Sequence, residues 1–251
     1  MAQPKILLFD IENSPILLWA WGIHDDPSHS MKFVKEDWYV MCWAAKWLGE
    51  DDVVSLALTD FRYNHHKPCD KKVLKGLWSL LDEADIVVAH NGKNFDCRKS
   101  NARFMKHGIK PPSPYRVVDT LTEARKHFMF TSNRLGDLGE YLGVGSKMDT
   151  GGFELWKECM EGNKKSWKKM VDYCKQDVVL LEKIYLKLQP YMSSHPNVGV
   201  ILNRAVCPVC GSDKIQYRGY AYTNVNKYRQ FVCKSCGAWR RDKKKVKEDD
   251  E

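Results

Sequence analysis

The stretch KILLFDIE, residues 5–12, joins a short apolar run to two acidic residues. The apolar part predicts a buried β-strand, and its end carries Asp10 and Glu12. Because alternate side chains of a strand point to opposite faces, these two carboxylates project to the same face. Like charges held so close repel each other. Either one of them takes up a proton, or a cation lies between them.

The chain has 251 residues, of which 43% are hydrophobic, and this composition indicates a globular protein of one or two domains. The mean hydropathy is −0.50. No apolar run approaches the roughly 20 residues that a membrane-spanning helix needs, so we do not expect a transmembrane protein. The first residues show neither a long apolar segment nor a small-residue cleavage site, and we expect a cytoplasmic protein.

Charge and cysteine are concentrated near the C-terminus. Residues 201–251 contain 12 Lys and Arg against 6 Asp and Glu, and they hold +6 of the net charge of +8. Such a segment favours a polyanionic partner, although it also suits a solvated surface. Four of the nine cysteines are grouped there, which indicates a metal site, and the five scattered ones suit buried positions in a cytosolic protein.

The order of predicted elements indicates an α/β fold. Aromatic and β-branched residues after the first strand predict an antiparallel meander, although residues 38–48 also suit a helix. Helices and strands then alternate, and helices follow, which predicts a mixed sheet with helices on both faces. The expected strands are 16–23, 39–48, 53–58, 86–90 and 115–120. Residues 91–108 are expected to form a loop and a helix that Gly108 ends, and the other expected helices are 70–85, 121–129, 134–142, 153–160 and 164–188.

Two further acidic residues follow predicted elements. Asp96 comes after the strand 86–90 and the loop HNGKNF, near a helix start, where a carboxylate also suits the helix dipole. Asp177 lies in the long helix, and Tyr173, four residues earlier, shares its face. A structural hydrogen bond is an alternative role for this last pair.

Together these residues predict a cluster of four carboxylates from three elements, which suits hard divalent cations. Two such ions about 3.5–4 Å apart can act on the attacking and leaving oxygens of a phosphoryl displacement. A tyrosine one helical turn from a ligand is placed to orient or deprotonate the attacking water.

Three motifs, FDIE at 9–12, HNGKNFD at 90–96 and YCKQD at 173–177, resemble those of the DEDD 3′–5′ exonucleases. The third motif has Tyr rather than His, and in this it resembles the DEDDy branch, which includes proofreading domains of family A and B DNA polymerases. The resemblance covers about residues 5–190 and implies a ribonuclease H-like mixed five-stranded sheet flanked by helices. It also implies that Tyr173 positions the hydrolytic water and that four carboxylates bind two Mg²⁺ or Mn²⁺ ions. These carboxylates are Asp10, Glu12, Asp96 and Asp177.

The resemblance also places three residues near the substrate. Asn13 stands where family members often have Thr or Ser after the motif-one Glu, and Asn91 matches the motif-two Asn. We expect both, and Phe95, to contact the substrate strand, although Asn91 equally suits a hydrogen bond within its loop. VVDT at 117–120 and RLGDLGEYLG at 134–143 are similar to family elements as well, with Asp119 in a supporting role. His90 suits a hydrogen-bonded histidine at a strand end rather than a catalytic base.

Two CxxC motifs, CPVC and CKSC, are separated by 22 residues, and each is followed by Gly. The spacing predicts a four-cysteine structural zinc ribbon, with a disulfide framework as the alternative. Aromatic residues between the motifs alternate with Lys and Arg, which favours stacking on single-stranded nucleic acid, and docking of a protein is the alternative. The expected zinc ligands are Cys207, Cys210, Cys233 and Cys236.

We therefore expect a ribonuclease H-like exonuclease domain at 1–195, a zinc ribbon at 200–242 and a charged, disordered tail at 243–251. The expected function is 3′–5′ hydrolysis of DNA from single-stranded or frayed ends, alone or in trans for a polymerase or recombination complex, with the ribbon orienting the substrate. An exoribonuclease, a structure-specific nuclease and a non-catalytic nucleic-acid-binding module are the alternatives.

Overall fold

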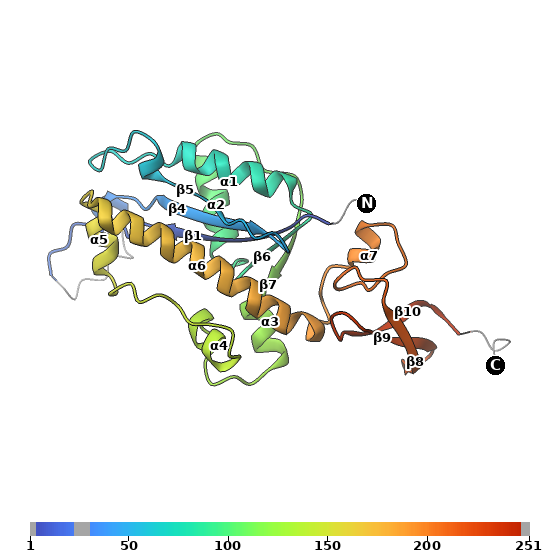
Figure 1. Ribbon diagram of the computed structural model, residues 1–251. Coiled ribbons are helices and arrows are strands. Elements are labelled where there is room, and N and C mark those ends of the chain that lie inside the picture. Colours follow the sequence, from blue (N-terminus) through green and yellow to red (C-terminus); the bar gives the residue numbers. More distant parts are fainter. Residues whose placement is uncertain (1–3, 23–30, 247–251) are drawn as a thin grey trace.

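A mixed sheet of five strands forms the centre of the larger part of the protein (Figure 1). The computed structural model describes residues 4–22 and 31–246. The strand order is β5-β4-β1-β6-β7, with the first three strands antiparallel and β1, β6 and β7 parallel. The predicted five-stranded sheet is confirmed. Its strands are β1 (Ile6–Asn13), β4 (Val40–Trp47), β5 (Val54–Ala57), β6 (Ile86–Ala89) and β7 (Arg116–Asp119).

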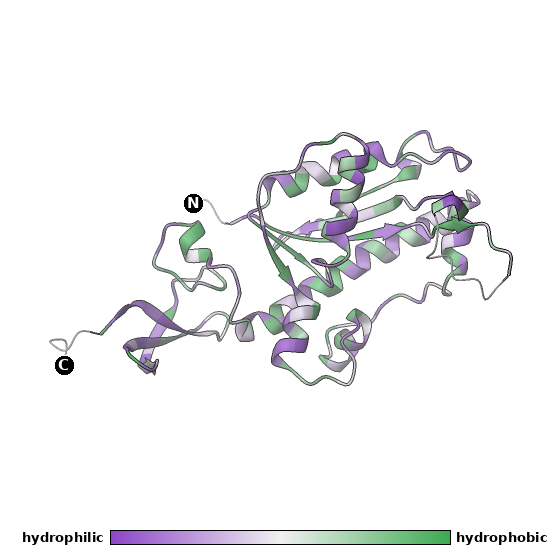
Figure 2. Cartoon of the chain, turned by 180° about the vertical axis from the view of Figure 1, so that it is seen from behind, coloured by the Kyte–Doolittle hydropathy of each residue, from purple (hydrophilic) through white to green (hydrophobic). Residues whose placement is uncertain are grey.

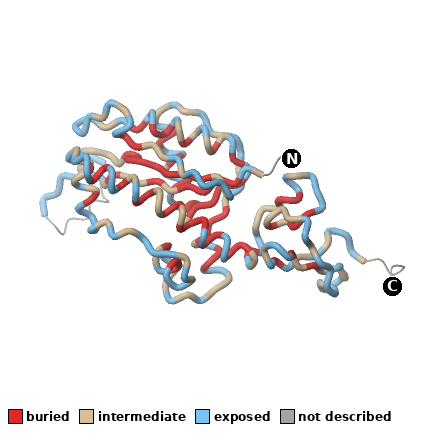
Figure 3. Tube along the Cα trace, in the orientation of Figure 1, coloured by how far each residue is buried: buried red, intermediate tan, exposed pale blue. Residues whose placement is uncertain are grey.

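The sheet forms because its central strands are apolar on both faces. The first four residues of β1 and all of β6 are buried, as expected for strands covered by helices on both sides. β4 is a strand, so the helical alternative for residues 38–48 is wrong. Figure 3 shows the buried core running along the sheet and the inner side of α6 (Lys164–Leu188).

Helices cover both faces of the sheet (Figure 1). α1 (Lys71–Glu83) buries Val73, Leu74, Leu77 and Leu81, and it lies with α2 (Asp96–Lys106) on one face. α6 crosses the other face, against β4 and β1. Among the helices of the described residues, none is long and apolar enough to cross a membrane. Three shorter helices contact α6: α3 (Thr120–His127), α4 (Leu135–Tyr141) and α5 (Glu154–Met160).

The strand expected at 16–23 is wrong in extent and place. Only β2 (Leu17–Leu18) is a strand, and it pairs with β3 (Val34–Glu36) in a separate two-stranded sheet. Both edges of β1 are already paired, with β4 and β6, so no edge was left for another strand beside it. Residue 23 lies outside the described residues.

A second, smaller unit follows α6 and the short helix α7 (Val198–Ile201). Its antiparallel sheet has the order β10-β9-β8, with β8 at Ile215–Tyr222, β9 at Lys227–Cys233 and β10 at Trp239–Lys245. The predicted tail at 243–251 is wrong at its start, because residues 243–245 belong to β10. Residues 247–251 lie outside the described residues. Since the buried apolar residues form two separate clusters, we propose the division into two domains near residues 195–200.

The stretch 193–199, which has the composition of a linker, is held in place by side chains. His195 Nε2 lies 2.8 Å from the hydroxyl oxygen of Tyr185 on α6. The Gln189 amide donates to that same oxygen at 2.9 Å and to the Val209 carbonyl of the ribbon at 3.4 Å. From the ribbon, Arg240 donates to the Met192 carbonyl at 2.6 Å. These contacts join the ribbon to the C-terminal end of α6.

Candidate active site and metal centre

Three of the four predicted carboxylates meet where β1 passes α6. Oxygens of Asp10, Glu12 and Asp177 all lie within 4.8 Å of one another. The fourth, Asp96, is the first residue of α2, and its Oδ1 accepts a hydrogen bond from the Ile11 amide at 3.2 Å. Asp96 is thus joined to the strand between the two acidic residues of the FDIE motif.

The cluster raises the pKa values of its members. Burial raises the pKa of Asp10 well above its usual range, and the charges of Asp96, Glu12 and Asp177 add to this effect. Burial, with the nearby Asp177 charge, raises the pKa of Glu12 to about 8. Burial raises that of Asp96 to about 7, although hydrogen bonds from its own amide and that of Ile11 lower it. While no ion is bound, protonation of a carboxyl reduces the repulsion within this cluster, and a bound cation would reduce it without protonation.

Lys147 is the basic partner of the cluster. Its Nζ lies 2.5 Å from Oδ2 of Asp177 and donates to the hydroxyl oxygen of Tyr173 at 2.7 Å. Burial lowers the pKa of this lysine, but the Asp177 carboxylate and Tyr173 raise it above its ordinary value. Sequence reasoning missed Lys147, which lies in an irregular segment outside the three motifs.

Two glycines of α4 explain how the Lys147 segment reaches the cluster. A Cβ added to Gly136 would lie 3.1 Å from Cγ of Lys147, and one added to Gly139 would lie 2.6 Å from the carbonyl oxygen of Gly145. The Gln176 amide of α6 also donates to the Ser146 carbonyl at 3.2 Å. The glycines lie in the stretch RLGDLGEYLG, so its family-like pattern was the signal from which this segment could have been found.

The donor set fits hard divalent cations. All four acidic side chains offer oxygen, the ligand atom that Mg²⁺ and Mn²⁺ prefer. Asp177 Oδ1 is buried and has no hydrogen-bond partner in the protein. A buried carboxylate oxygen without a partner is costly, and a bound cation would satisfy it. The four carboxylates also exceed the single positive charge of Lys147 beside them.

Asp119 holds the loop that leads to Asp96. Its Oδ1 accepts from the Asn91 amide and its Oδ2 from the Lys93 amide, both at 3.1 Å. The same carboxylate accepts from the Leu121 and Thr122 amides at the start of α3. One side chain therefore ties the end of β7 to the loop before α2.

The expected substrate residues differ in their surroundings. The side-chain amide of Asn13 is buried, and both its nitrogen and its oxygen lack partners in the protein. Asn91 has a positive φ of 67°, and its carbonyl accepts from the Phe95 amide in a tight turn. Phe95 is 39% exposed. His90 has both ring nitrogens engaged at 2.9 Å, with Thr120 and the Asn133 carbonyl.

The four grouped cysteines form a second candidate metal centre. Their sulfurs all lie within 4.8 Å of one another, with Cys207 and Cys236 at 3.8 Å and Cys210 and Cys233 at 3.6 Å. Zn–S bonds of about 2.3 Å in a tetrahedron separate the sulfurs by about 3.8 Å, so the site fits zinc. Gly211 and Gly237, each following a CxxC motif, have φ values of 75° and 78° and close matching turns.

Comparisons with known proteins agree with this fold. The family model of the RNase H superfamily matches residues 50–189. This is more than half of the chain, which therefore belongs to the RNase H superfamily. The matched region begins after β1, so Asp10 and Glu12 lie outside it.

Among solved structures, the family B DNA polymerase from the hyperthermophilic archaeon Pyrobaculum calidifontis is similar, with a TM-score of 0.55 and 18% sequence identity. The match covers 76% of this chain and 25% of the polymerase, so the chain corresponds to about a quarter of that protein. At this identity the likeness concerns the fold alone. No curated protein matches the chain.

Proposed function

We propose that this protein is a two-metal-ion 3′–5′ exonuclease that hydrolyses DNA from single-stranded or frayed 3′ ends. The observation that carries the proposal is the group of oxygens from Asp10, Glu12 and Asp177 within 4.8 Å, with Asp96 bound to the intervening amide. Membership of the RNase H superfamily and the fold shared with a DNA polymerase support it. The proposed ligands of two Mg²⁺ or Mn²⁺ ions are Asp10, Glu12, Asp96 and Asp177.

When bound, two divalent cations supply an activated water and stabilise the leaving oxygen. Burial and the Asp177 charge raise the pKa of Tyr173 above its ordinary value, so its hydroxyl stays protonated at neutral pH. Its role is therefore to orient the attacking water rather than to remove its proton. Lys147 holds the Tyr173 oxygen and the Asp177 carboxylate in place. Asn13, Asn91 and Phe95 are the proposed contacts to the terminal nucleotides.

The proposal extends to the smaller domain and to the setting of the protein. Cys207, Cys210, Cys233 and Cys236 hold one structural Zn²⁺ ion, and the ribbon aids nucleic-acid binding. The partner is DNA with a 3′ end, and a polymerase or recombination complex would be served in trans. We assign the protein to the cytoplasm, where thiols stay reduced.

The decisive experiment is a time course on 5′-labelled single-stranded DNA and matched RNA with Mg²⁺ or Mn²⁺. We expect a ladder of products that shorten from the 3′ end, with DNA cleaved faster than RNA. The ladder should vanish in Asp177→Asn, which removes a proposed ligand. Asp172→Asn is the matched control, because Asp172 is an exposed carboxylate of the same helix, and it should cleave like the intact protein.

Each other outcome indicates an alternative. Faster cleavage of RNA would make the protein an exoribonuclease, and one discrete product from a branched substrate would indicate a structure-specific nuclease. Retention of the labelled strand without any cleavage by the intact protein would indicate a non-catalytic binding module. Cleavage that survives in Asp177→Asn would contradict the assigned site.

A further inference from the structure

One face of the ribbon sheet carries a row of exposed tyrosines. Tyr217 pairs with Phe231 and Tyr220 with Arg229, so the register shifts by one residue between them. Gly219, within this bulge, has a φ of 70°, which a residue with a side chain rarely adopts. Without the bulge, Tyr217 and Tyr220 would point to opposite faces. The bulge therefore places three tyrosines on one face. They are Tyr217, Tyr220 and Tyr222, which are 42%, 43% and 72% exposed.

Cationic side chains of the neighbouring strand lie against these rings. The Arg229 guanidinium is 3.8 Å from the centroid of the Tyr217 ring, and the Lys227 ammonium is 4.3 Å from that of Tyr220. Each pair combines an aromatic plane with a positive charge beside it, as surfaces that bind single-stranded nucleic acid do.

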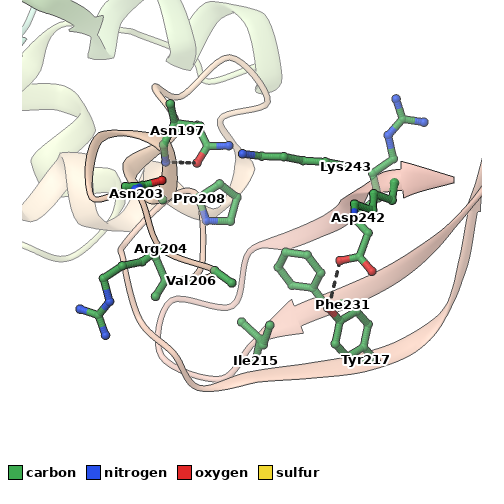
Figure 4. Close-up of a pocket in the computed structure, with 15 residues that line it drawn as sticks. Asn197, Asn203, Arg204, Val206, Pro208, Ile215, Tyr217, Phe231, Asp242 and Lys243 are labelled. Carbon is green, nitrogen blue, oxygen red and sulfur yellow. Dashed lines mark hydrogen bonds between the residues drawn. The ribbon is translucent and has the colours of Figure 1, made fainter.

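The tyrosine row begins in a cleft of about 540 Å³ between α7 and the ribbon sheet (Figure 4). Ile215, Tyr217 and Phe231 line its ribbon side, and Figure 4 shows the Tyr217 and Phe231 rings side by side. Their centroids are 5.8 Å apart. One acidic residue, Asp242, accepts from the Tyr217 hydroxyl at 3.0 Å. Four basic residues also line the cleft: Arg204, Arg241, Lys243 and Lys244.

The charge of the domain matches a polyanion. Residues 201–246 contain eleven Lys and Arg against two Asp and Glu. Figure 2 shows the strands of this sheet as mostly hydrophilic, in contrast to the central sheet. The sheet exposes aromatic rings among cationic side chains, and its positive charge favours phosphates.

We propose that Tyr217, Tyr220 and Tyr222, with Arg229 and Lys227, form a stacking platform for single-stranded nucleic acid that enters the cleft beside α7. The inference rests on the proposed function, because it names the form of the substrate that the same protein holds. Tyr220 and Tyr222 are two strand residues apart, about 6.8 Å, whereas stacked nucleotides of one duplex strand are about 3.4 Å apart. Bases stacked on successive tyrosines are therefore pulled apart, which an unpaired strand permits and a duplex does not.

The platform has a fixed relation to the proposed active site. Leu188, the last residue of α6, lies eleven residues beyond Asp177, which is about 17 Å along the helix. Directly after it, Gln189 contacts the ribbon carbonyl of Val209. The ribbon is thus attached to the same helix that carries Asp177 and Tyr173. It can hold one part of a strand while the 3′ end lies at the proposed active site.

The test measures binding of fluorescent single-stranded DNA by anisotropy, with RNA and duplex DNA in parallel. All variants carry Asp177→Asn, so that the result does not depend on hydrolysis. Replacing both Tyr220 and Tyr222 by Ala should weaken single-strand binding at least tenfold, since stacking contributes about 1–3 kcal/mol per base. Replacing both by Phe should keep binding within about threefold, because the rings remain. Arg229→Gln should lower the salt dependence by about one phosphate contact.

The matched control is Trp239→Ala. Trp239 is 45% exposed, but it pairs with Val232 and so lies on the opposite face of the sheet. Zinc content should stay the same in every variant. The proposal would be overturned if Trp239→Ala weakened binding as much as the tyrosine pair, if the Tyr-to-Ala pair bound normally, or if duplex bound as tightly as single strand. If the intact protein bound single strands through the tyrosines but never cleaved them, the proposed exonuclease activity would be refuted, and the proposed stacking platform would stand.

Discussion

The ammonium nitrogen of Lys147 lies 2.5 Å from Oδ2 of Asp177, which comes from a different part of the chain. It also donates to the Tyr173 hydroxyl, so one lysine connects the carboxylate cluster to the residue that we assign to the water. The remaining oxygen of Asp177 has no partner in the protein. The carboxylate thus has one side held by a cation and the other available to a metal ion.

Removing this lysine should impair hydrolysis. Charge-assisted hydrogen bonds contribute about 1.5–3 kcal/mol, so Lys147→Met should lower kcat about tenfold to a hundredfold. Steady-state rates on single-stranded DNA at saturating Mn²⁺ measure this. Lys168→Met, which changes an exposed lysine of α6, should keep the intact rate. Full activity of Lys147→Met would show that Tyr173 and Asp177 hold their positions without it.

Gly139 should be sensitive to a single methyl group. In Gly139→Ala, the new Cβ would lie 2.6 Å from the Gly145 carbonyl oxygen and 2.8 Å from Cδ1 of Leu180. Backbone must move to relieve the first contact, and the segment that carries Lys147 moves with it. We expect a loss of activity of roughly tenfold and a lower melting temperature. Glu140→Ala, at an exposed position of the same helix, is the control, and equal rates for the two variants would refute the argument.

The stability of the protein without divalent ions should depend on pH through Glu12. Because the pKa of this carboxyl in the folded state is about 8, above its ordinary value, the folded protein binds more protons than the unfolded chain between these two pKa values. Stability is therefore lost as the pH rises through this window. Glu12→Gln removes the titration, and at pH 8.5 it should be more stable than the intact protein by roughly 1–3 kcal/mol.

Melting curves of both proteins at pH 5 and pH 8.5 measure this difference. Each kcal/mol corresponds to roughly 2–4 °C for a chain of this size. The two proteins should melt together at pH 5, and added Mg²⁺ should stabilise the intact protein more than Glu12→Gln at pH 8.5. A variant that is less stable than the intact protein at pH 8.5 would show that Glu12 is compensated by groups other than a bound cation.

Asp70 should stabilise the fold at neutral pH. Asp70 directly precedes α1, but its side chain makes no capping bond. It accepts instead from Arg103 at 2.6 and 2.7 Å and from the Val40 amide at 2.8 Å. Burial raises the pKa of Asp70, but hydrogen bonds from Arg103, Val40 and His107 lower it below its ordinary value. Asp70→Asn removes the buried carboxylate that pairs with Arg103, leaves the more exposed Asp37 at 3.9 Å, and should cost about 3–5 kcal/mol in urea unfolding at pH 7.

The sign of the Asp70 effect can be checked with acid. A lowered pKa stabilises the folded state above the ordinary pKa of about 3.9 and ceases to do so as the pH falls through the lowered value. The difference between the intact protein and Asp70→Asn should therefore shrink below about pH 4. Asp52→Asn, at an exposed position, should match the intact protein throughout, and a constant difference at all pH values would exclude the ion pair as its cause.

The cysteine centre should hold one zinc ion per chain. Cys233→Ser removes a ligand from a site whose other sulfurs lie within 4.8 Å, and it should lose zinc and unfold the ribbon, since its small apolar cluster is built around these cysteines. Elemental analysis and native mass spectrometry measure the metal. Cys69→Ser, at an exposed free cysteine, should retain it. A zinc-free intact protein with two disulfides would establish the alternative framework.

Local patterns were sufficient where a residue and its element are neighbours in sequence. The run of apolar residues before Asp10 predicted a buried strand, and the spacing of Tyr173 and Asp177 predicted one helix face. The meander was less predictable, because whether residues 16–23 join the sheet depends on which edges of β1 are already paired. Composition alone could not show this competition between strands.

The sequence by itself predicted the fold class, the common strand face of Asp10 and Glu12, the common helix face of Tyr173 and Asp177, and the group of four cysteines, because strand alternation, helical periodicity and CxxC spacing are local constraints. The tertiary structure alone decided the contact of Lys147 with Asp177, the attachment of the ribbon to α6 and the face on which the tyrosines gather. Those features depend on the close approach that Gly139 permits, on side-chain hydrogen bonds across the domain boundary and on a one-residue bulge at Gly219. Each couples segments that are separated in the chain, and packing rather than local propensity sets their geometry.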